Sequence, residues 1–327
     1  MQKYGSNAYN SQTIAPQPPA KAKRRLLSKL LSAGQAALPF HRTHQQIPQS
    51  ILEDMTPERW REMEQEDDGD FQYNWNEQFI QIYVPQLWGR LYLFLAALAK
   101  VIVLYISIFI MIIQIAIIPA THYDILGFIS SSIWYLEWIF IPSALIWAQF
   151  ELSTNFRTNL WFLRPRLLFE FNRQTGMVTL YRPGRLVRFS HPFVEFDCVL
   201  TSAPTQLGFM RYGLMLVHRY QGYRRGIPAA LLLSKLSEPR DEMLRLWNFI
   251  QCYMDVSQPL PDMLALEAGR LNDPTTAKVD KKTGRTPRYW RDMDKATFAQ
   301  TIRQTVRTYP DPMMGETIPV VADRESC

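Results

Sequence analysis

The sequence is poor in the residues from which most enzyme and metal sites are built. It has three cysteines, Cys198, Cys252 and Cys327, which form no Cys-x-x-Cys pair and lack metal-ligand spacing. Its five histidines are scattered, and no glycine-rich nucleotide loop, His-Glu-x-x-His motif or Gly-x-Ser-x-Gly motif is present. We therefore predict a non-enzymatic protein with no catalytic residues, no cofactor and no metal.

The chain also lacks a strong excess of charge. Its formal net charge is +6 over 327 residues, and the basic residues are spread along the sequence. A nucleic-acid partner is not expected from this distribution. The few, widely separated cysteines are typical of a reducing compartment.

Long apolar runs are the strongest feature that the sequence does have. Residues 101–118 carry no charge and approach the length needed to cross a hydrocarbon core of about 30 Å. The apolar sequence begins near Leu91, and a break at 119–124 separates it from a second, less apolar run up to residue 150. We predict a two-helix transmembrane hairpin over residues 91–150.

The distribution of basic residues predicts the orientation of this hairpin. The connecting segment has no Lys or Arg, whereas Arg90 and Lys100 precede it and Arg157 and Arg164 follow it. The positive-inside rule then places both termini in the cytoplasm. The predicted location is the inner (cytoplasmic) membrane, with the chain crossing more than once and a phospholipid membrane as one partner.

Glu137 falls in the middle of the second predicted span. An ionisable group is costly there and is often functional. From the helical rise, its depth matches that of Tyr105 or Ser107 on the first span, so we predict an intramembrane polar contact among these residues. The alternatives are a shifted span that leaves Glu137 near the surface, or an ion path, which would need more polar partners.

The first ninety residues are predicted to form two segments. Residues 1–50 combine a polar, disordered tail with a basic amphipathic helix, in which Lys21 to Lys29 alternate with leucines. That helix would lie on an anionic leaflet, dock on the protein or remain a basic tail. Residues 51–90 form an acidic helix, begun by Thr56 and Pro57, and a juxtamembrane segment.

Residues 151–258 change to the short alternating pattern of β-strands. Six strand-like runs follow one another through tight turns, and a helix then runs from Pro239 to about Asp255. Its apolar stripe includes Trp247, Ile250 and Met254. We predict an α+β cytoplasmic domain, an antiparallel pleckstrin-homology-like partial barrel capped by this one C-terminal helix.

Several motifs in this region resemble an uncharacterised family of proteobacterial inner-membrane proteins, a domain of unknown function. The matching positions are Asn172, Arg173 and Gly176, then Arg182, Pro183 and Gly184, then Trp247, Phe249, Ile250, Tyr253 and Met254. The chain departs from the pattern at Arg185 and at His191-Pro192-Phe193. The resemblance covers roughly residues 90–260 and implies a setting near type VI secretion or polymorphic toxin genes, without catalytic residues.

One hairpin tip is the candidate binding patch. It is basic and aromatic, and it comprises His218, Arg219, Tyr220, Tyr223, Arg224 and Arg225. Such a tip can bind lipid phosphates, although a solvated turn is the alternative. Residues 259–327 are predicted to be a linker with a possible docking helix that carries Phe298, Ile302 and Val306 on one face.

These features predict a binding protein. The first hypothesis is an integral membrane protein whose cytoplasmic domain binds a protein partner, a toxin or secretion component, as an accessory or immunity protein of a type VI secretion or toxin system. The alternatives are a scaffold that senses anionic lipid and a toxin that perturbs membranes. The oligomeric state is left open.

Overall fold

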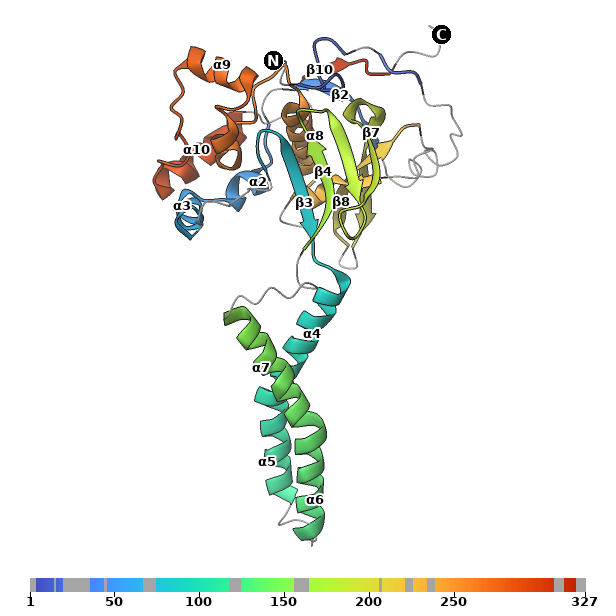
Figure 1. The fold of residues 1–327 in the computed structure, drawn as a ribbon, viewed down its shortest axis with the longest axis vertical. Helices are drawn as coiled ribbons and strands as arrows, with labels where there is room; N and C mark the ends of the chain where they lie inside the picture. The colour runs from blue at the N-terminus through green and yellow to red at the C-terminus, as the bar shows by residue number, and fades with distance from the viewer. Residues whose placement is uncertain are drawn as a thin grey trace. The chain divides into compact units, whose positions relative to one another are not determined.

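The computed structural model of the protein describes residues 4–14, 16–19, 36–43, 46–66, 75–117, 125–155, 165–205, 208–220, 226–233, 239–308 and 315–321. The chain divides into two compact units (Figure 1). Unit 1 combines Met1–Ile82 with Leu167–Cys327, and unit 2 is Tyr83–Arg166. Unit 2 is thus inserted into the sequence of unit 1.

The predicted fold class is wrong in three respects. Within the described residues, the protein is α+β with ten strands in three sheets, so a single pleckstrin-like partial barrel does not describe it. More than one helix lies in the C-terminal part of the chain. Among the described residues, one helix, Leu87–Ile113, is long and apolar enough to cross a membrane, in place of the predicted two.

The first sheet has the strand order β3-β4-β5-β6. Its strands are β3 (Phe79–Val84), β4 (Arg166–Asn172), β5 (Met177–Tyr181) and β6 (Val187–Pro192). The predicted turns after Asn172 and Tyr181 therefore do join neighbouring antiparallel strands. The sequence did not indicate β3, which precedes unit 2 in the chain yet lies beside β4.

The second sheet has the order β1-β7-β8-β9, and a third sheet pairs β10 with β2. The strands of the second sheet are β1 (Ala36–Leu38), β7 (Phe196–Pro204), β8 (Met210–His218) and β9 (Gly226–Pro228), and those of the third are β2 (Phe40–Thr43) and β10 (Gly315–Ile318). The predicted sixth strand is short, because the chain turns into the 3-10 helix η4 (Ala229–Leu232). Strands from both ends of the chain, rather than barrel closure, complete the sheets.

Helix α8 (Arg240–Met254) confirms the predicted helix but occupies a different environment. All residues from Met243 to Met254 are buried, so both the apolar and the polar faces are covered. The N-terminal segment covers part of the polar face, where Asn248 donates a hydrogen bond to Gln46 and the His41 amide donates one to Gln251. Helix α8 is a central core element.

Segments at both ends of the chain also pack into unit 1. The N-terminal helices are α2 (Gln49–Asp54) and α3 (Pro57–Glu66), and the C-terminal ones are η5 (Leu264–Gly269), α9 (Pro274–Thr283) and α10 (Lys295–Thr308). Helix α10 packs on α2 and α3 and buries Phe298 and Ile302. Much of the segment predicted to be a linker is therefore folded, and its predicted helix docks on the protein itself.

Unit 2 consists of two helical stretches that run alongside each other (Figure 1). The first comprises α4 (Leu87–Val101), the π-helix η1 (Ile102–Ile106) and α5 (Ser107–Ile117), and the second comprises α6 (Ile125–Tyr135), the π-helix η2 (Leu136–Phe140) and α7 (Ile141–Asn155). The first stretch carries Arg90 and Lys100 in α4, and the second carries Glu137 in η2 and Glu151 in α7.

Candidate functional site

The structure does not expose the predicted binding patch as a basic surface. His218 and Arg219 are buried, and the Arg219 guanidinium donates hydrogen bonds of 2.9 and 2.6 Å to Asp197. The hydroxyl of the partly exposed Tyr220 donates a hydrogen bond to the Pro18 carbonyl. Tyr223, Arg224 and Arg225 lie outside the described residues. The described part of the patch is therefore a buried histidine, a buried arginine paired with Asp197, and an exposed tyrosine.

The structure also changes the predicted polar contact in unit 2. Glu137 and Tyr105 are both exposed, whereas the Ser107 hydroxyl lies 2.7 Å from the Tyr135 hydroxyl. Ser107 and Tyr135 directly adjoin the π-helical segments η1 and η2. The two stretches thus share a hydrogen bond at this level, but its partner on the second stretch is Tyr135.

The stripe on α8 is structural. Trp247, Ile250 and Met254 are all almost completely buried. The Trp247 ring lies against Phe40 and Phe193, with ring centroids 5.0 and 5.8 Å apart, and its indole N–H donates to the Pro39 carbonyl. These contacts join α8 to the N-terminal segment and to the turn after β6.

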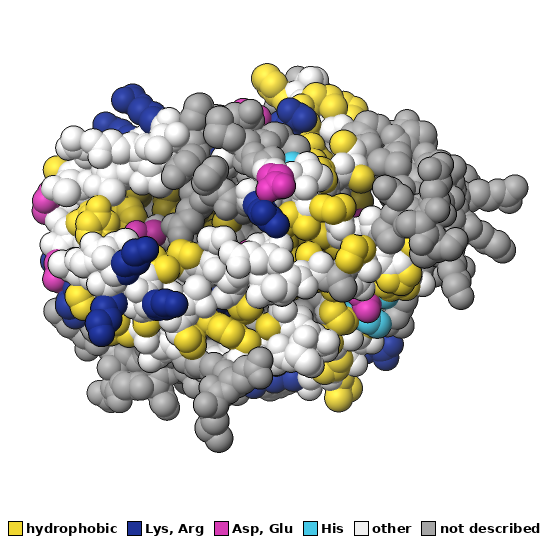
Figure 2. Space-filling model, turned by 90° about the horizontal axis from the view of Figure 1, so that it is seen from above, with side chains coloured by type: hydrophobic (Ala, Val, Ile, Leu, Met, Phe, Trp, Pro, Cys, Tyr) yellow, Lys and Arg dark blue, Asp and Glu magenta, His cyan; other side chains and the backbone are white. Residues whose placement is uncertain are grey.

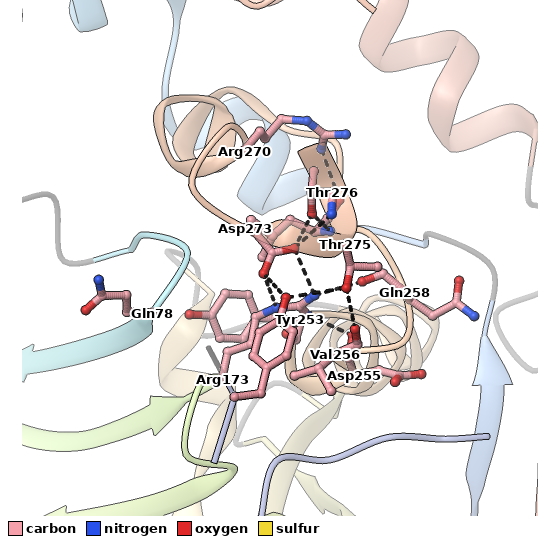
Figure 3. Close-up of polar contacts among 12 residues, drawn as sticks. Gln78, Arg173, Tyr253, Asp255, Val256, Gln258, Arg270, Asp273, Thr275 and Thr276 are labelled. Carbon is pink, nitrogen blue, oxygen red and sulfur yellow. Dashed lines mark hydrogen bonds and ion pairs between the residues drawn. The ribbon is translucent and has the colours of Figure 1, made fainter. Parts of the chain in front are cut away.

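Arg173, one of the residues of the family-like motif, is completely buried at the C-terminal end of α8 (Figure 3). Its guanidinium donates hydrogen bonds to the main-chain carbonyls of Tyr253, Asp255 and Gln258. It also forms an ion pair of 3.2 Å with Asp273. The last carbonyls of a helix have no intrahelical partner, so Arg173 supplies the missing donors.

Asp273 connects this network to α9 (Figure 3). Its carboxylate caps α9 by accepting a hydrogen bond from the Thr276 amide, and it accepts another from the Tyr4 hydroxyl. Burial raises the pKa of Asp273, but the charge of Arg173 and the hydrogen bonds from Thr276 and Tyr4 outweigh burial and hold it below its ordinary value. The network joins the β4–β5 turn, α8 and α9, and its role is structural.

Gly176, the glycine of the same motif, is required by close packing. Its φ is +70°, and a Cβ atom there would lie 1.9 Å from the Asn7 carbonyl oxygen. Glycine is therefore required where residues 4–14 cross the β4–β5 turn. The motif is accounted for by packing, not by a ligand.

Three potential metal ligands converge elsewhere in unit 1. The Oε2 atom of Glu195 lies 2.9 Å from Nε2 of His218 and 3.5 Å from Nδ1 of His191. One ligand atom from each residue can be chosen so that all three lie within 4.8 Å of one another. Two imidazoles and a carboxylate form a donor set that suits zinc and other divalent transition metals.

Local structure explains why these residues meet. His191 lies near the end of β6, and the 3-10 turn η3 (Phe193–Glu195) brings Glu195 back beside it. Pairing of β7 with β8 places His218 opposite Phe196, and the Arg219 amide donates a hydrogen bond to the Glu195 carbonyl. The cluster was not predicted, because its two histidines are 27 positions apart in the sequence. The available local signal was His-x-x-x-Glu around a proline-containing turn.

An exposed feature of a different kind lies at the β5–β6 turn. Leu186 and Val187 are 65% and 58% exposed, and the exposed Arg182, Arg185 and Arg188 surround them in sequence. We name residues 182–188 the arginine tip. No acidic residue interrupts it. Exposed apolar residues among arginines are suited to an anionic, partly apolar surface.

The face of the molecule in Figure 2 has a different character. Its Lys and Arg side chains occur in several separate places, with apolar and acidic side chains between them (Figure 2). On that face no single large basic surface stands out among the described residues. The charge pattern on this face therefore does not indicate a particular class of binding partner.

Comparison of the chain with family models, curated proteins and solved structures found no match. The resemblance to an inner-membrane family stays a prediction based on its motifs.

Proposed function

We propose that the protein is a non-enzymatic, membrane-anchored scaffold that holds unit 1 against an anionic lipid surface. One observation carries this proposal: the arginine tip lies at the end of the sheet where β3 ends and β4 begins, the two strands that connect unit 1 to unit 2 in the chain. The register supports this placement, because Phe169 pairs with Leu180 and Tyr181 pairs with Val187. The Arg173 amide donates a hydrogen bond to the Gln78 carbonyl, so the start of β3 lies beside the end of β4.

The helix Leu87–Ile113 supplies the anchor. Its 27 residues correspond to about 40 Å of helix, more than the ~30 Å of a hydrocarbon core. Large apolar side chains such as Phe94, Phe109 and Ile112 are exposed, unlike those of a core helix in a soluble protein. A lipid environment would remove this apolar surface from water.

Chain connectivity supports a location with both ends of the chain on one side of the membrane. β3 and β4 are neighbours in one sheet, although unit 2 separates them in sequence. Unit 1 is one compact unit, so in this proposal its two chain segments, before and after unit 2, lie on the same side of the membrane. The basic residues near the ends of the helical stretches in sequence, Arg90, Arg157 and Arg164, favour the cytoplasmic side of an inner membrane.

Charged substitutions test the anchor. We expect Phe109→Arg with Ile112→Arg to abolish retention in the membrane fraction after alkaline extraction. Both positions lie in the middle part of the uncharged run 101–118, and an arginine costs about 2.5–3.5 kcal/mol at a span centre. Phe109→Leu with Ile112→Leu is the matched control and should leave retention unchanged. Equal retention of the arginine variant would show that the helix is not embedded.

A fluorescence measurement tests contact between the arginine tip and lipid. An environment-sensitive dye on Val187→Cys, in full-length protein with Cys327→Ser, would be compared in nanodiscs of zwitterionic lipid and of lipid containing phosphatidylglycerol. Cys198 and Cys252 are buried and should not label. We expect emission at shorter wavelength in the anionic discs, because the apolar tip enters the interface.

The control dye is placed on Leu271→Cys, which is exposed in a part of unit 1 without an arginine-rich tip. Its emission should not depend on lipid charge. Replacing Arg182, Arg185 and Arg188 by Gln should remove the shift at position 187. Water-like emission at position 187 in both kinds of nanodisc would overturn the lipid proposal while leaving the anchor intact.

A protein-binding function is the second candidate, and the β7–β8 turn favours it. Phe209 and Met210 are 71% and 50% exposed, and such apolar residues can form the centre of a protein interface. An accessory or immunity role in a type VI secretion or toxin system would use a surface of this kind. Affinity purification from native membranes should then recover a stoichiometric protein that Phe209→Asp with Met210→Asp releases.

A further inference from the structure

We propose that His191, Glu195 and His218 bind one divalent transition-metal ion, for which zinc is the probe. The inference does not rest on the proposed membrane function, since none of the three residues belongs to the arginine tip or to unit 2. Neutral imidazole nitrogens and a carboxylate oxygen are ordinary zinc ligands. Three protein ligands are also the number found in zinc sites that keep one position for an exchangeable ligand.

The distances fit a shared ion. With metal–ligand bonds of about 2.0–2.1 Å, two ligand atoms on a tetrahedral zinc lie roughly 3.3 Å apart. The separations of Glu195 Oε2 from His218 Nε2 and His191 Nδ1, 2.9 and 3.5 Å, lie on either side of that value. The ligand atoms of His191 and His218 lie within 4.8 Å of each other, so side-chain rotation that brings the two rings together would let all three atoms surround one ion.

The surrounding fold fixes the two rings. The His218 ring packs edge-on against Phe196, with centroids 5.3 Å apart, and the His191 ring lies 5.8 Å from the Phe189 ring. Main-chain hydrogen bonds from the Phe193 amide to Gly176 and from the Arg219 amide to Glu195 hold the turn between them. A metal would bind ligands that are already oriented, which limits the entropy lost on binding.

The two rings face the same small volume. The imidazole centroids are only 4.0 Å apart, and both rings contact the Glu195 carboxylate. A divalent ion in this volume would be coordinated by nitrogen lone pairs of the two rings and by the carboxylate. The neighbouring Arg219 does not leave a bare positive charge to oppose the ion, because Asp197 forms an ion pair with it.

The site combines a buried ligand with access from solvent. The His218 side chain is almost fully buried, whereas those of His191 and Glu195 are 26% and 25% exposed. An ion can therefore enter from the side of His191 and Glu195. Water would occupy the position that the protein leaves open.

Direct titration tests the site. Full-length protein, purified in detergent without a polyhistidine tag and stripped with chelator, would be titrated with zinc by calorimetry and with cobalt by visible absorption. We expect one equivalent per chain and a cobalt spectrum typical of nitrogen and oxygen ligands. His191→Ala and Glu195→Gln should each weaken zinc binding by about 100-fold or more, since removing a ligand should cost at least as much as removing a group that orients one.

Matched variants separate metal binding from folding. Asp197→Asn breaks the adjacent ion pair with Arg219 but retains all three ligands, so it should still bind one zinc. Zinc should raise the Tm of the wild type and of Asp197→Asn, but not that of His191→Ala, a partly exposed site where truncation should preserve the fold. Unchanged zinc affinity in His191→Ala, or no stoichiometric binding by folded wild type, would overturn the proposal.

Discussion

Replacing Arg173 with Met should lower the free energy of unfolding by about 3–5 kcal/mol, because it leaves the buried Asp273 carboxylate without its ion pair. The carbonyls of Tyr253 and Asp255 at the end of α8, and that of Gln258 in the segment after it, lose their donor at the same time. For a unit of this size, the Tm should fall by roughly 6–20 °C. Thermal unfolding of the full chain in detergent, followed by circular dichroism, would measure it.

Arg288→Met is the matched control for this change. Arg288 forms an exposed ion pair with Asp292 at 3.0 Å, and such pairs contribute about 0–1 kcal/mol. A double-mutant cycle of Arg173→Met with Asp273→Asn should show strong coupling, since the two groups share one network. If Arg173→Met were as stable as Arg288→Met, the network would not hold α8 and α9 in place.

The effect of Arg173→Met should also depend on pH. The pKa of Asp273 is below its ordinary value in the folded wild type, so its contribution is present at neutral pH and is lost as the pH falls through that folded pKa. The variant lacks the main group that lowers this pKa, so the buried, ionised Asp273 carboxylate destabilises the folded variant at neutral pH. Protonation of Asp273 at lower pH removes this destabilisation. The stability difference between wild type and variant should therefore narrow as the pH falls.

Replacing Trp247 with Ala should also cost about 3–5 kcal/mol, the range for removing a large aromatic side chain from a core. Trp247 is 1% exposed and contacts Phe40 and Phe193, so the cavity would lie between α8, the N-terminal segment and η3. Thermal and chemical unfolding of the variant would give the free energy of unfolding.

A second substitution of Trp247 separates its hydrogen bond from its packing, and an exposed position serves as the control. Trp247→Phe keeps most of the apolar contact but removes the hydrogen bond to the Pro39 carbonyl, so we expect a loss of about 1–3 kcal/mol. Leu271→Ala removes an exposed side chain and should change stability by no more than about 0.5 kcal/mol. A Trp247→Ala variant as stable as Leu271→Ala would mean that α8 is not anchored by this ring.

Several elements followed from local sequence. The tight turns at Asn172 and Pro183 join β4, β5 and β6 as predicted, and the periodic apolar residues after Pro239 form α8. Thr56 accepts a hydrogen bond from the Arg59 amide at the start of α3. The apolar run from Leu87 to Ile113 is a continuous helix. Turn preferences, capping and periodicity act between residues a few positions apart, so the sequence determines them directly.

Tertiary structure decided the rest. β1 joins β7 through Leu38 and Cys198, and β10 joins β2 through Ile318 and Phe40. Such pairs depend on which strand edges remain available after folding, and no local periodicity identifies them. The same limit explains why the local pattern of strands wrongly predicted a single partial barrel.

The candidate site residues show the same difference between what local sequence predicts and what tertiary contacts decide. The sequence marked Arg219 as a surface ligand and Arg173 as a turn residue, yet the fold buries both beside acidic partners. It left His191 and His218 unconnected, although strand pairing brings them together at Glu195. The sequence by itself determined the local elements and the apolar helix. Only the tertiary structure decided which charged and metal-ligating side chains meet, because their partners come from distant segments that burial brings together.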